Sequence, residues 1–382
     1  MEAALLLYGD TERNAALRHE LPIVVIDPFL FGLVDGRPHV MVSALERERI
    51  AEALPAAVLH DVRDLGFYEL IDGELSRDAV TLELASRAAA AMGVREVIVD
   101  PDFPVAIADR LRADGIELTP SAEAVADLRR SKTPAELAGV RRAQRAAEAG
   151  MAAAAATIAA AEPDGESLRA GDGPLTAEVV RAAIRDACAA AGAPAPPDII
   201  VASVWQGWGH ESGSGPLPAS LPIQVDLWPR DEASGCWADM TRTFVVGEAP
   251  PAVREQEALV RDAIERVREA ARPGITGREL HGIACDVFEA AGHRTQRTGP
   301  GDEDPNEGFQ FGLGHGVGLE VHEEPGLGRL GRSPLVAGDV VAIEPGLWER
   351  EVGGVRFEDL LLITDDGPET LTDYPYDLTP RG

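Results

Sequence analysis

Short apolar runs and longer segments of helical periodicity alternate over the first 120 positions of the chain. Apolar runs bounded by turn residues predict strands, and apolar residues spaced three or four positions apart predict helices. The predicted strands are Ile23–Ile26, His39–Val42 and Glu96–Val99, and the predicted helices are Ala44–Ala53, Ser76–Met92 and Pro104–Ala113. This alternation is typical of a small α/β domain. Because the segment has no dense cluster of His, Asp and Glu, we interpret it as a structural or substrate-shaping domain.

The Thr119-Pro120 step interrupts regular structure and marks a boundary near Leu118–Val125. The 382 residues are enough for two domains, at roughly 150 residues per domain. We therefore expect an N-terminal α/β domain at residues 1–122 and a second domain at residues 123–382.

Helices and strands are grouped, rather than alternating, in the second domain. Two of its helices open with capping boxes, at Thr133–Glu136 and at Thr276–Glu279. The helices are predicted from Thr133 to about Ala161, over Thr176–Ala191, over Ala252–Ala271 and from Thr276 to Gly292, and the strands over Asp198–Ser203, Ile223–Trp228, Ala238–Val246, Val340–Glu344 and Glu358–Thr364. Helices grouped around strands that are joined as hairpins predict an α+β fold.

The net charge of the chain excludes some classes of binding partner. The 65 acidic and 35 basic residues give a formal net charge of −30. This charge argues against a nucleic-acid partner and against an anionic membrane surface, since both attract clustered Lys and Arg. Lys132 is the only lysine, which we attribute to codon composition, and the sequence assigns it no function.

Targeting and redox signals favour a cytoplasmic protein. The N-terminal stretch MEAALLLYGD lacks the basic region of a signal peptide, and the alanine-rich stretch Ala146–Ala161 is too weakly apolar for a membrane span. The three cysteines are too few for a disulfide framework and match no zinc pattern, which indicates buried thiols in a reducing compartment. They are Cys188, Cys236 and Cys285.

Candidate chemistry begins with a predicted β-hairpin that carries one aspartate on each arm. Asp226 lies near the end of the first arm, and Asp239 lies on the returning arm. Farther along the chain, His315 stands in a glycine-rich segment. Taken singly, an Asp in such a position is usually a turn or capping residue, and the histidine is explained as a loop residue.

Glu344 and Glu358 are harder to explain singly. Glu344 follows the apolar run Val340–Ile343, and Glu358 precedes the apolar run Leu360–Ile363. A carboxylate beside a buried strand is costly unless it is paired or bound to a metal. Gathered with the two aspartates, the glutamates would repel one another, and two divalent cations would balance the four negative charges. Oxygen-rich ligation with one histidine suits Mn²⁺, Co²⁺, Fe²⁺ or Zn²⁺.

Four stretches within Ser203–Thr364 resemble the pita-bread metallopeptidases, which comprise Xaa-Pro aminopeptidases, prolidases and methionine aminopeptidases. These stretches are ADMTRTFVVG, GHGVGLEVHEEP, IEPGLW and VRFEDLLLIT. The stretch LRRSKTPAELAGVRRAQ resembles the helix that leads into the catalytic domain of the prolidase branch. The separate N-terminal domain also points to that branch. The resemblance implies a pita-bread catalytic domain at residues 123–382.

The resemblance also implies a centre of two divalent metal ions, with Mn²⁺ favoured over Co²⁺, Zn²⁺ and Fe²⁺. Asp239 and Glu358 would bridge the two ions, with Asp226 completing one site. A water or hydroxide between the ions would be the nucleophile. The full set of matching positions is Asp226, Asp239, His315, Glu344 and Glu358.

Four further roles come from the same resemblance. Glu344 would shuttle protons, while His210 and His322 would steady the scissile carbonyl and the tetrahedral intermediate. Arg356 matches an arginine near the metal site of the prolidase branch, although a structural salt bridge explains it equally well. The implied substrate is a short peptide, cleaved after its N-terminal residue and before proline. Relatives of this branch are commonly homodimers, so we expect a homodimer.

The chain departs from the family pattern at three places. Asp226 and Asp239 are 13 positions apart, two more than is usual, and this keeps both on one face if the extra pair lies in the turn. Trp228 replaces a common glycine, and Phe311 replaces a histidine that prolidases often carry. Two alternatives stay open. One is a hydrolase of a non-peptide C–N bond, of the ectoine-derivative type, and the other is a non-catalytic binding protein on this fold.

Overall fold

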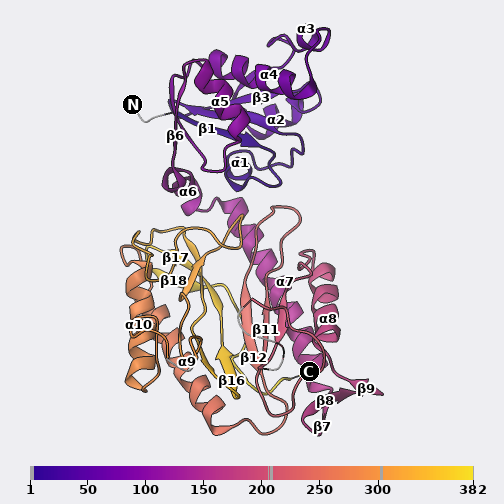
Figure 1. The fold of residues 1–382 in the computed structure, drawn as a ribbon, viewed down its shortest axis with the longest axis vertical. Coiled ribbons are helices and arrows are strands. Elements are labelled where there is room, and N and C mark those ends of the chain that lie inside the picture. The colour runs from indigo at the N-terminus through magenta and orange to yellow at the C-terminus, as the bar shows by residue number, and fades with distance from the viewer. Residues whose placement is uncertain (1–3, 205, 207–209, 302–303, 382) are drawn as a thin grey trace. The chain divides into compact units, whose positions relative to one another are not determined.

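The computed structural model describes residues 4–204, 206, 210–301 and 304–381. Contacts divide the chain into two compact units, Met1–Arg129 and Arg130–Gly382, and each is described here by itself (Figure 1). The domain boundary at 122/123 remains a prediction.

A mixed six-stranded sheet forms the centre of the first unit, in the order β4-β3-β2-β1-β5-β6. β1 pairs antiparallel with β2 and parallel with β5. The strands are β1 (Ala4–Gly9), β2 (Phe29–Val34), β3 (Arg37–Val42), β4 (Val58–Asp61), β5 (Glu96–Val99) and β6 (Glu117–Pro120). The helices are α1 (Ala15–Glu20), α2 (Arg47–Ala53), α3 (Phe67–Ile71), α4 (Arg77–Met92), α5 (Val105–Ala113) and α6 (Ala122–Arg130). This α/β arrangement confirms the predicted class of the N-terminal part.

The prediction of a strand at Ile23–Ile26 is wrong, since this segment is irregular. Val25 alone is buried there, while the side chain of Ile26 is 67% exposed. The backbone of Val25 is satisfied by Thr11, whose hydroxyl accepts from the Val25 N–H at 2.7 Å and whose N–H donates to the Val25 carbonyl at 3.1 Å. Arg49 donates to the Val24 carbonyl at 2.9 Å, so side chains and irregular backbone contacts, rather than a neighbouring strand, supply partners to this apolar run.

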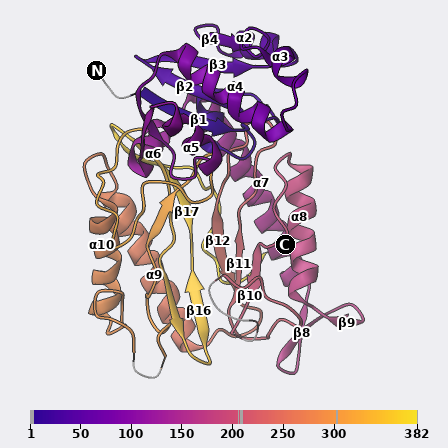
Figure 2. The same cartoon turned by 45° about the horizontal axis from the view of Figure 1, so that its top comes forward.

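Four long helices surround the strands of the second unit. They are α7 (Pro134–Ala159), α8 (Ala177–Ala190), α9 (Pro251–Ala270) and α10 (Gly277–Ala290). Both capping boxes form as predicted, with Thr133 and Thr276 each accepting from the backbone of the glutamate three positions later. In two views most of the strands lie between the pair α7 and α8 and the pair α9 and α10, and one short ribbon projects on the far side of α8 (Figures 1 and 2).

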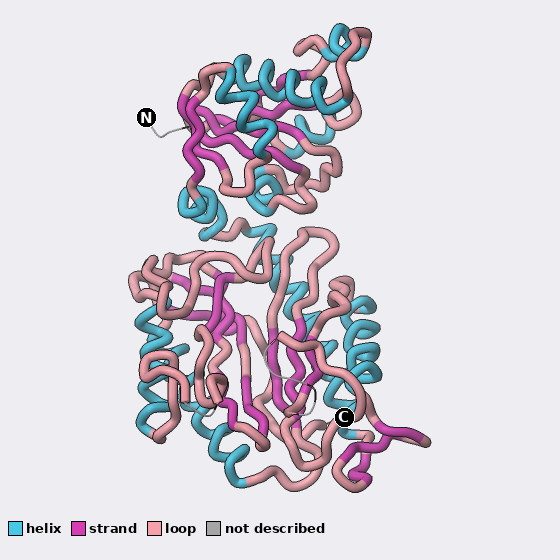
Figure 3. The backbone as a smooth tube through the Cα atoms, in the orientation of Figure 1, coloured by secondary structure: helices cyan, strands magenta, loops and turns pink. Residues whose placement is uncertain are grey.

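The strands of the second unit form several small antiparallel sheets (Figure 3). One contains β10 (Ile200–Ala202), β11 (Ile223–Leu227) and β12 (Met240–Phe244), and another contains β13 (Gly314–Gly316), β14 (Val340–Ile343), β17 (Asp359–Thr364) and β18 (Gly367–Thr370). β15 (Gly346–Glu349) pairs with β16 (Gly353–Arg356), and β7 (Glu162–Asp164), β8 (Ser167–Ala170) and β9 (Gly173–Pro174) form a separate ribbon. Helices grouped around hairpins confirm the predicted α+β class.

The register of the β11–β12 hairpin decides where the two aspartates point. Leu227 pairs with Met240, and an isolated bridge from Arg230 to Trp237 continues the same register. Asp239 therefore lies opposite Trp228, two positions from Asp226, so both aspartates share one face. The turn lies beyond this bridge, which is where the extra pair of residues was expected.

The three cysteines are buried and free, as expected for small core thiols. Over the part of the chain that the structure describes, every helix is too short or too polar to cross a bilayer.

Candidate metal centre

Strand ends from two different sheets bring the predicted ligands together. Asp226 lies on β11 and Asp239 immediately precedes β12, while His315 lies on β13. Glu344 follows β14, held by a bond of 2.7 Å from its N–H to the Leu313 carbonyl. Glu358 precedes β17, and its N–H donates to the Thr241 carbonyl at 3.1 Å.

Three overlapping groups of side chains have the spacing of metal ligands, and one of them, Asp239 with His315 and His322, brings in a histidine outside the predicted ligand set. Asp226, Asp239 and Glu358 each offer an oxygen, and these atoms lie within 4.8 Å of one another. His315, Glu344 and Glu358 form a second such group. Glu358 belongs to both of these groups, so the geometry accommodates two cations side by side.

The orientation of His315 suits a ligand. Its Nδ1 lies 3.1 Å from the carbonyl oxygen of Gly316, which places the ring proton on Nδ1. Nε2 then presents its lone pair to the carboxylates, 3.7 Å from Asp239 Oδ2 and 3.7 Å from Glu344 Oε1. A backbone acceptor of this kind commonly fixes the tautomer of a metal-binding histidine.

Buried oxygens without partners indicate that the cluster is built around cations. Among the described residues, Asp226 Oδ1 and Glu358 Oε1 have no hydrogen-bond partner. Asp226 is 6% exposed and Glu358 is 1% exposed. Buried polar atoms are nearly always hydrogen-bonded or bound to an ion. The residues present therefore fit a pair of divalent cations.

The pKa values of the cluster lead to the same conclusion. Burial, together with the neighbouring carboxylates, raises the pKa of Asp239 and of Glu358 well above the usual range. Burial also raises the pKa of Glu344 to about 7, although Arg356 opposes this shift. The pKa of His315 is lowered to about 4 by burial and by His322. Without added positive charge the carboxylates would take up protons, and divalent cations remove that need.

A cavity of about 330 Å³ opens beside this cluster. Its lining contains the predicted ligands and the three other predicted site residues, His210, His322 and Arg356. The remaining lining residues are Asp198, Ile200, Trp228 and Val321. The ring of His322 meets that of His315 edge-on, with centroids 4.2 Å apart. All eight predicted site residues are thus assembled at one cavity.

Asp198 is a cavity residue that sequence reasoning missed. It lies in the stretch APAPPDII, which contains no spacing or pattern that indicates a ligand. The fold places Asp198 in the lining of the same cavity as Asp226.

Arg356 is buried against two of the predicted ligands. One guanidinium nitrogen donates to Asp226 Oδ2, and the other lies 3.4 Å from Glu344 Oε2. Burial works against the charge of Arg356, but the surrounding carboxylates, led by Asp226, outweigh it and raise its pKa. The salt bridge considered for this residue is present, and it lies within the site.

Phe311 does not take part in the described lining of the cavity. Its ring packs edge-on against Phe309, with centroids 5.0 Å apart. Trp228, the other departure from the family pattern, does line the cavity, so an apolar wall comes from that side.

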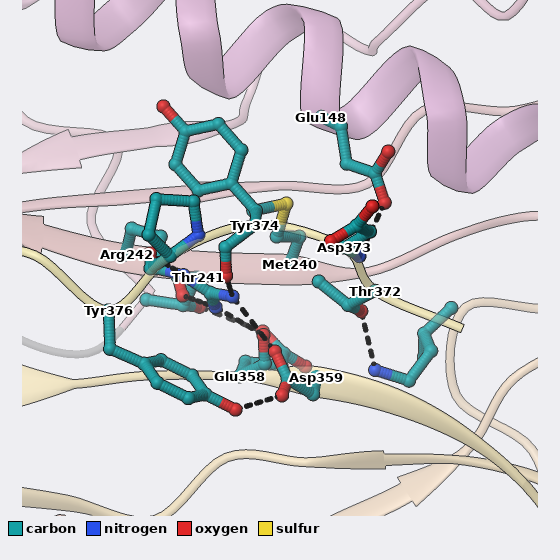
Figure 4. A network of polar contacts seen from close by, with 12 residues as sticks. Glu148, Met240, Thr241, Arg242, Glu358, Asp359, Thr372, Asp373, Tyr374 and Tyr376 are labelled. Atoms are coloured by element: carbon teal, nitrogen blue, oxygen red, sulfur yellow. Dashed lines mark hydrogen bonds and ion pairs between the residues drawn. The ribbon is translucent and has the colours of Figure 1, made fainter. Parts of the chain in front are cut away.

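A network of hydrogen bonds holds Glu358 in place (Figure 4). Thr241 Oγ1 donates to Glu358 Oε2 at 2.8 Å, and Arg242 donates to the Glu358 carbonyl at 2.7 Å. Arg242 also donates to Asp359 Oδ1 at 2.9 Å, and the hydroxyl of Tyr376 donates to the other oxygen of Asp359. The sequence placed Arg242 inside a motif but gave no sign of these partners.

Comparison with known protein families shows which family the chain belongs to. Residues 138–365 match the family model of metallopeptidase family M24, which is more than half of the chain. This chain belongs to metallopeptidase family M24. Members of the family use divalent metals, in agreement with the donor set described above.

Curated relatives within the family match over part of their length. An Xaa-Pro dipeptidase of Pyrococcus furiosus is 42% identical over 135 residues, which are 35% of this chain and 35% of that protein. An Xaa-Pro dipeptidase of Pyrococcus horikoshii is 40% identical over 135 residues, with the same coverage. The chain thus aligns with about a third of the length of these relatives.

Solved structures extend the likeness to the whole fold. An Xaa-Pro dipeptidase from Bacillus anthracis matches with a TM-score of 0.77 at 21% identity, covering 98% of this chain and 94% of that one. An X-Pro aminopeptidase from Thermotoga maritima matches with a TM-score of 0.75 at 18% identity, covering 98% and 97%. The fold is therefore the pita-bread fold preceded by an N-terminal α/β region, as the sequence predicted.

Proposed function

We propose that this chain hydrolyses the peptide bond after the N-terminal residue of short peptides in which proline is second, using two divalent metal ions. The observation that carries the proposal is the buried carboxylate cluster. Asp226 Oδ1 and Glu358 Oε1 have no partner among the described residues, and both belong to groups with ligand spacing. The names of the relatives support the choice of Xaa-Pro peptides.

Asp226, Asp239 and Glu358 would hold one ion, and His315, Glu344 and Glu358 the other. A divalent pair lowers the pKa of a water molecule and stabilises negative charge on a carbonyl oxygen. Mn²⁺ is our choice of metal, because four of the five assigned ligands are carboxylates.

Glu344 would move the proton of the attacking water to the departing proline nitrogen. Its side chain is 17% exposed, so it reaches the cavity from the buried cluster. That nitrogen belongs to a tertiary amide without an N–H and needs a proton in order to leave. His322 and His210, which both line the cavity, would donate hydrogen bonds to the carbonyl oxygen as negative charge develops on it.

Proline selectivity would come from shape. Trp228, Ile200 and Val321 give the cavity an apolar side on which a proline ring fits. The volume of about 330 Å³ is at the small end for ligand sites and suits a dipeptide.

The test compares kcat/KM for Ala-Pro, Ala-Ala and a tripeptide beginning Ala-Pro, with Mn²⁺, Co²⁺ or Zn²⁺ added. We expect Ala-Pro to be cleaved best. Equal cleavage of Ala-Ala would contradict proline selectivity. If none of the peptides is cleaved with any metal, the peptidase proposal fails and a hydrolase of another C–N bond replaces it.

A further inference from the structure

The single lysine of the chain occupies a buried position beside the candidate site. Lys132 Nζ donates to Glu323 Oε1, and each of the two side chains is only 3% exposed. All other basic residues of the chain are arginines. Where composition so strongly favours arginine, one buried lysine indicates a place that a guanidinium does not fit.

The end of the Lys132 side chain lies close to the backbone of Gly318. A Cβ built on Gly318 would lie 2.7 Å from Lys132 Cε and 2.6 Å from Glu323 Oε1. The lysine stem and the carboxylate therefore lie directly against the backbone of a turn. Arginine and lysine are not interchangeable at such a site, because the guanidinium is a rigid planar fork and the ammonium is compact.

Glu323, the partner of Lys132, closes the turn that carries His322. The backbone of Glu323 exchanges two hydrogen bonds of 2.9 Å with Gly316, the residue that follows His315. Its second carboxylate oxygen accepts from the Glu320 N–H at 3.3 Å. The backbone of Glu323 therefore joins both ends of the turn and its side chain ties Lys132 to the middle of the turn, while His315 and His322 stand side by side.

The same turn is tied to the strand that carries Asp239. The Trp237 N–H donates to the Gly318 carbonyl at 2.7 Å, two positions before Asp239. Lys132 itself lies immediately before the capping residue of α7. Lys132 thus connects the start of α7 to the 316–323 turn, which contributes Val321 and His322 to the cavity.

We propose that Lys132 is a positioning residue for His322, which it orients by holding Glu323 and the 316–323 turn in place. This inference rests on the proposed function for the role of His322. It predicts that neither an apolar residue nor an arginine can replace Lys132 without displacing the His322 ring.

The variants are Lys132→Arg, Lys132→Met with Glu323→Gln, and Arg141→Met. The double substitution removes both charges of this ion pair, because removing only one partner of a buried pair is strongly destabilising. Arg141 pairs with Glu369 near the start of the same helix, with side chains 40% and 47% exposed, and serves as the matched control.

The first readout does not depend on activity. Ring signals of the histidines are recorded by NMR, and the His322 signal is identified by its loss in His322→Ala. We expect this signal to move in Lys132→Arg and in the double variant and to stay in place in Arg141→Met. An unmoved His322 signal in both Lys132 variants overturns the inference, even if the protein proves to lack peptidase activity.

The second readout is kcat in the Mn²⁺-loaded protein, measured with and without His322→Ala. A misplaced catalytic group costs on the order of 10–100-fold, and we expect that loss in both Lys132 variants. In the His322→Ala background the same substitutions should change kcat less than about twofold, because the group they position is absent. An equal loss in both backgrounds assigns Lys132 a general structural role and refutes positioning of His322.

Discussion

Replacing Arg242 by methionine should strongly destabilise the unit Arg130–Gly382. The guanidinium is 1% exposed and donates five hydrogen bonds, four to backbone carbonyls and one to the buried carboxylate of Asp359. Methionine keeps an unbranched apolar stem but removes every donor, so the Asp359 charge loses its counter-charge.

The expected loss follows from that burial. Breaking a buried ion pair by removing one partner costs about 3–5 kcal/mol. A loss of 1 kcal/mol lowers Tm by about 2–4 °C in a unit of this size, so we expect Tm to fall by roughly 6–20 °C. Arg141→Met removes an exposed pair that is worth about 0–1 kcal/mol.

The assay is thermal and urea unfolding of the full chain for Arg242→Met, Arg141→Met, Asp359→Asn and the double variant of Arg242 and Asp359. The double variant should lose less than the sum of its single changes, because the two side chains contact each other. A loss in Arg242→Met no larger than that in Arg141→Met would refute the reasoning.

Three further outcomes are expected. Glu344→Gln should lower kcat by roughly 10²–10⁴-fold, and more than His322→Ala, because Glu344 is proposed both to bind metal and to move the proton. Equal, mild effects in a steady-state assay would contradict these roles. Elemental analysis should find about two divalent ions per chain, chelation should abolish turnover, and Mn²⁺ at 100 times its Kd should stabilise the fold by about 2.7 kcal/mol per site; full turnover in excess chelator would exclude the metal centre. In the first unit, a hydrogen bond from Arg63 lowers the pKa of Asp61 to about 2. Because the folded pKa lies below the unfolded value of about 4, Asp61 adds stability that is complete above pH 4 and lost as pH falls towards 2. Asp61→Asn should therefore make the urea midpoint depend less steeply on pH over that range. An unchanged dependence of the midpoint on pH would contradict this.

The parts of the fold that follow local rules could be predicted from the sequence. Both capping boxes need only two residues three positions apart, and both form. The shared face of Asp226 and Asp239 follows from strand parity, which the observed register reproduces. Predictions failed where the partner is distant or irregular, as at Ile23–Ile26, whose backbone is satisfied by Thr11.

The site residues divide in the same way. The motif stretches contain seven of the residues that line the cavity, from Asp239 to Glu358, and their binding of metal remains a prediction. Neither Asp198 nor Lys132 was singled out by its residue pattern as a site residue, and only the fold shows what lies beside each. The pair formed by Lys132 and Glu323 spans 191 positions, and no periodicity records such a contact.

The carbonyl partners of Arg242 have a consequence for protein synthesis. Arg242 donates to Pro375, which is translated 133 positions later, and to Tyr374. Until that segment has been made, two of the five hydrogen bonds of the guanidinium lack their acceptors. The unit Met1–Arg129 has a core of its own and can fold while the rest is still being translated. The candidate metal centre must instead wait for a late segment, because Glu358 is one of its predicted ligands and Arg242, which bonds to Glu358, has acceptors at Tyr374 and Pro375. A ribosome-bound chain that ends before residue 358 should therefore carry a folded first unit and an incomplete centre.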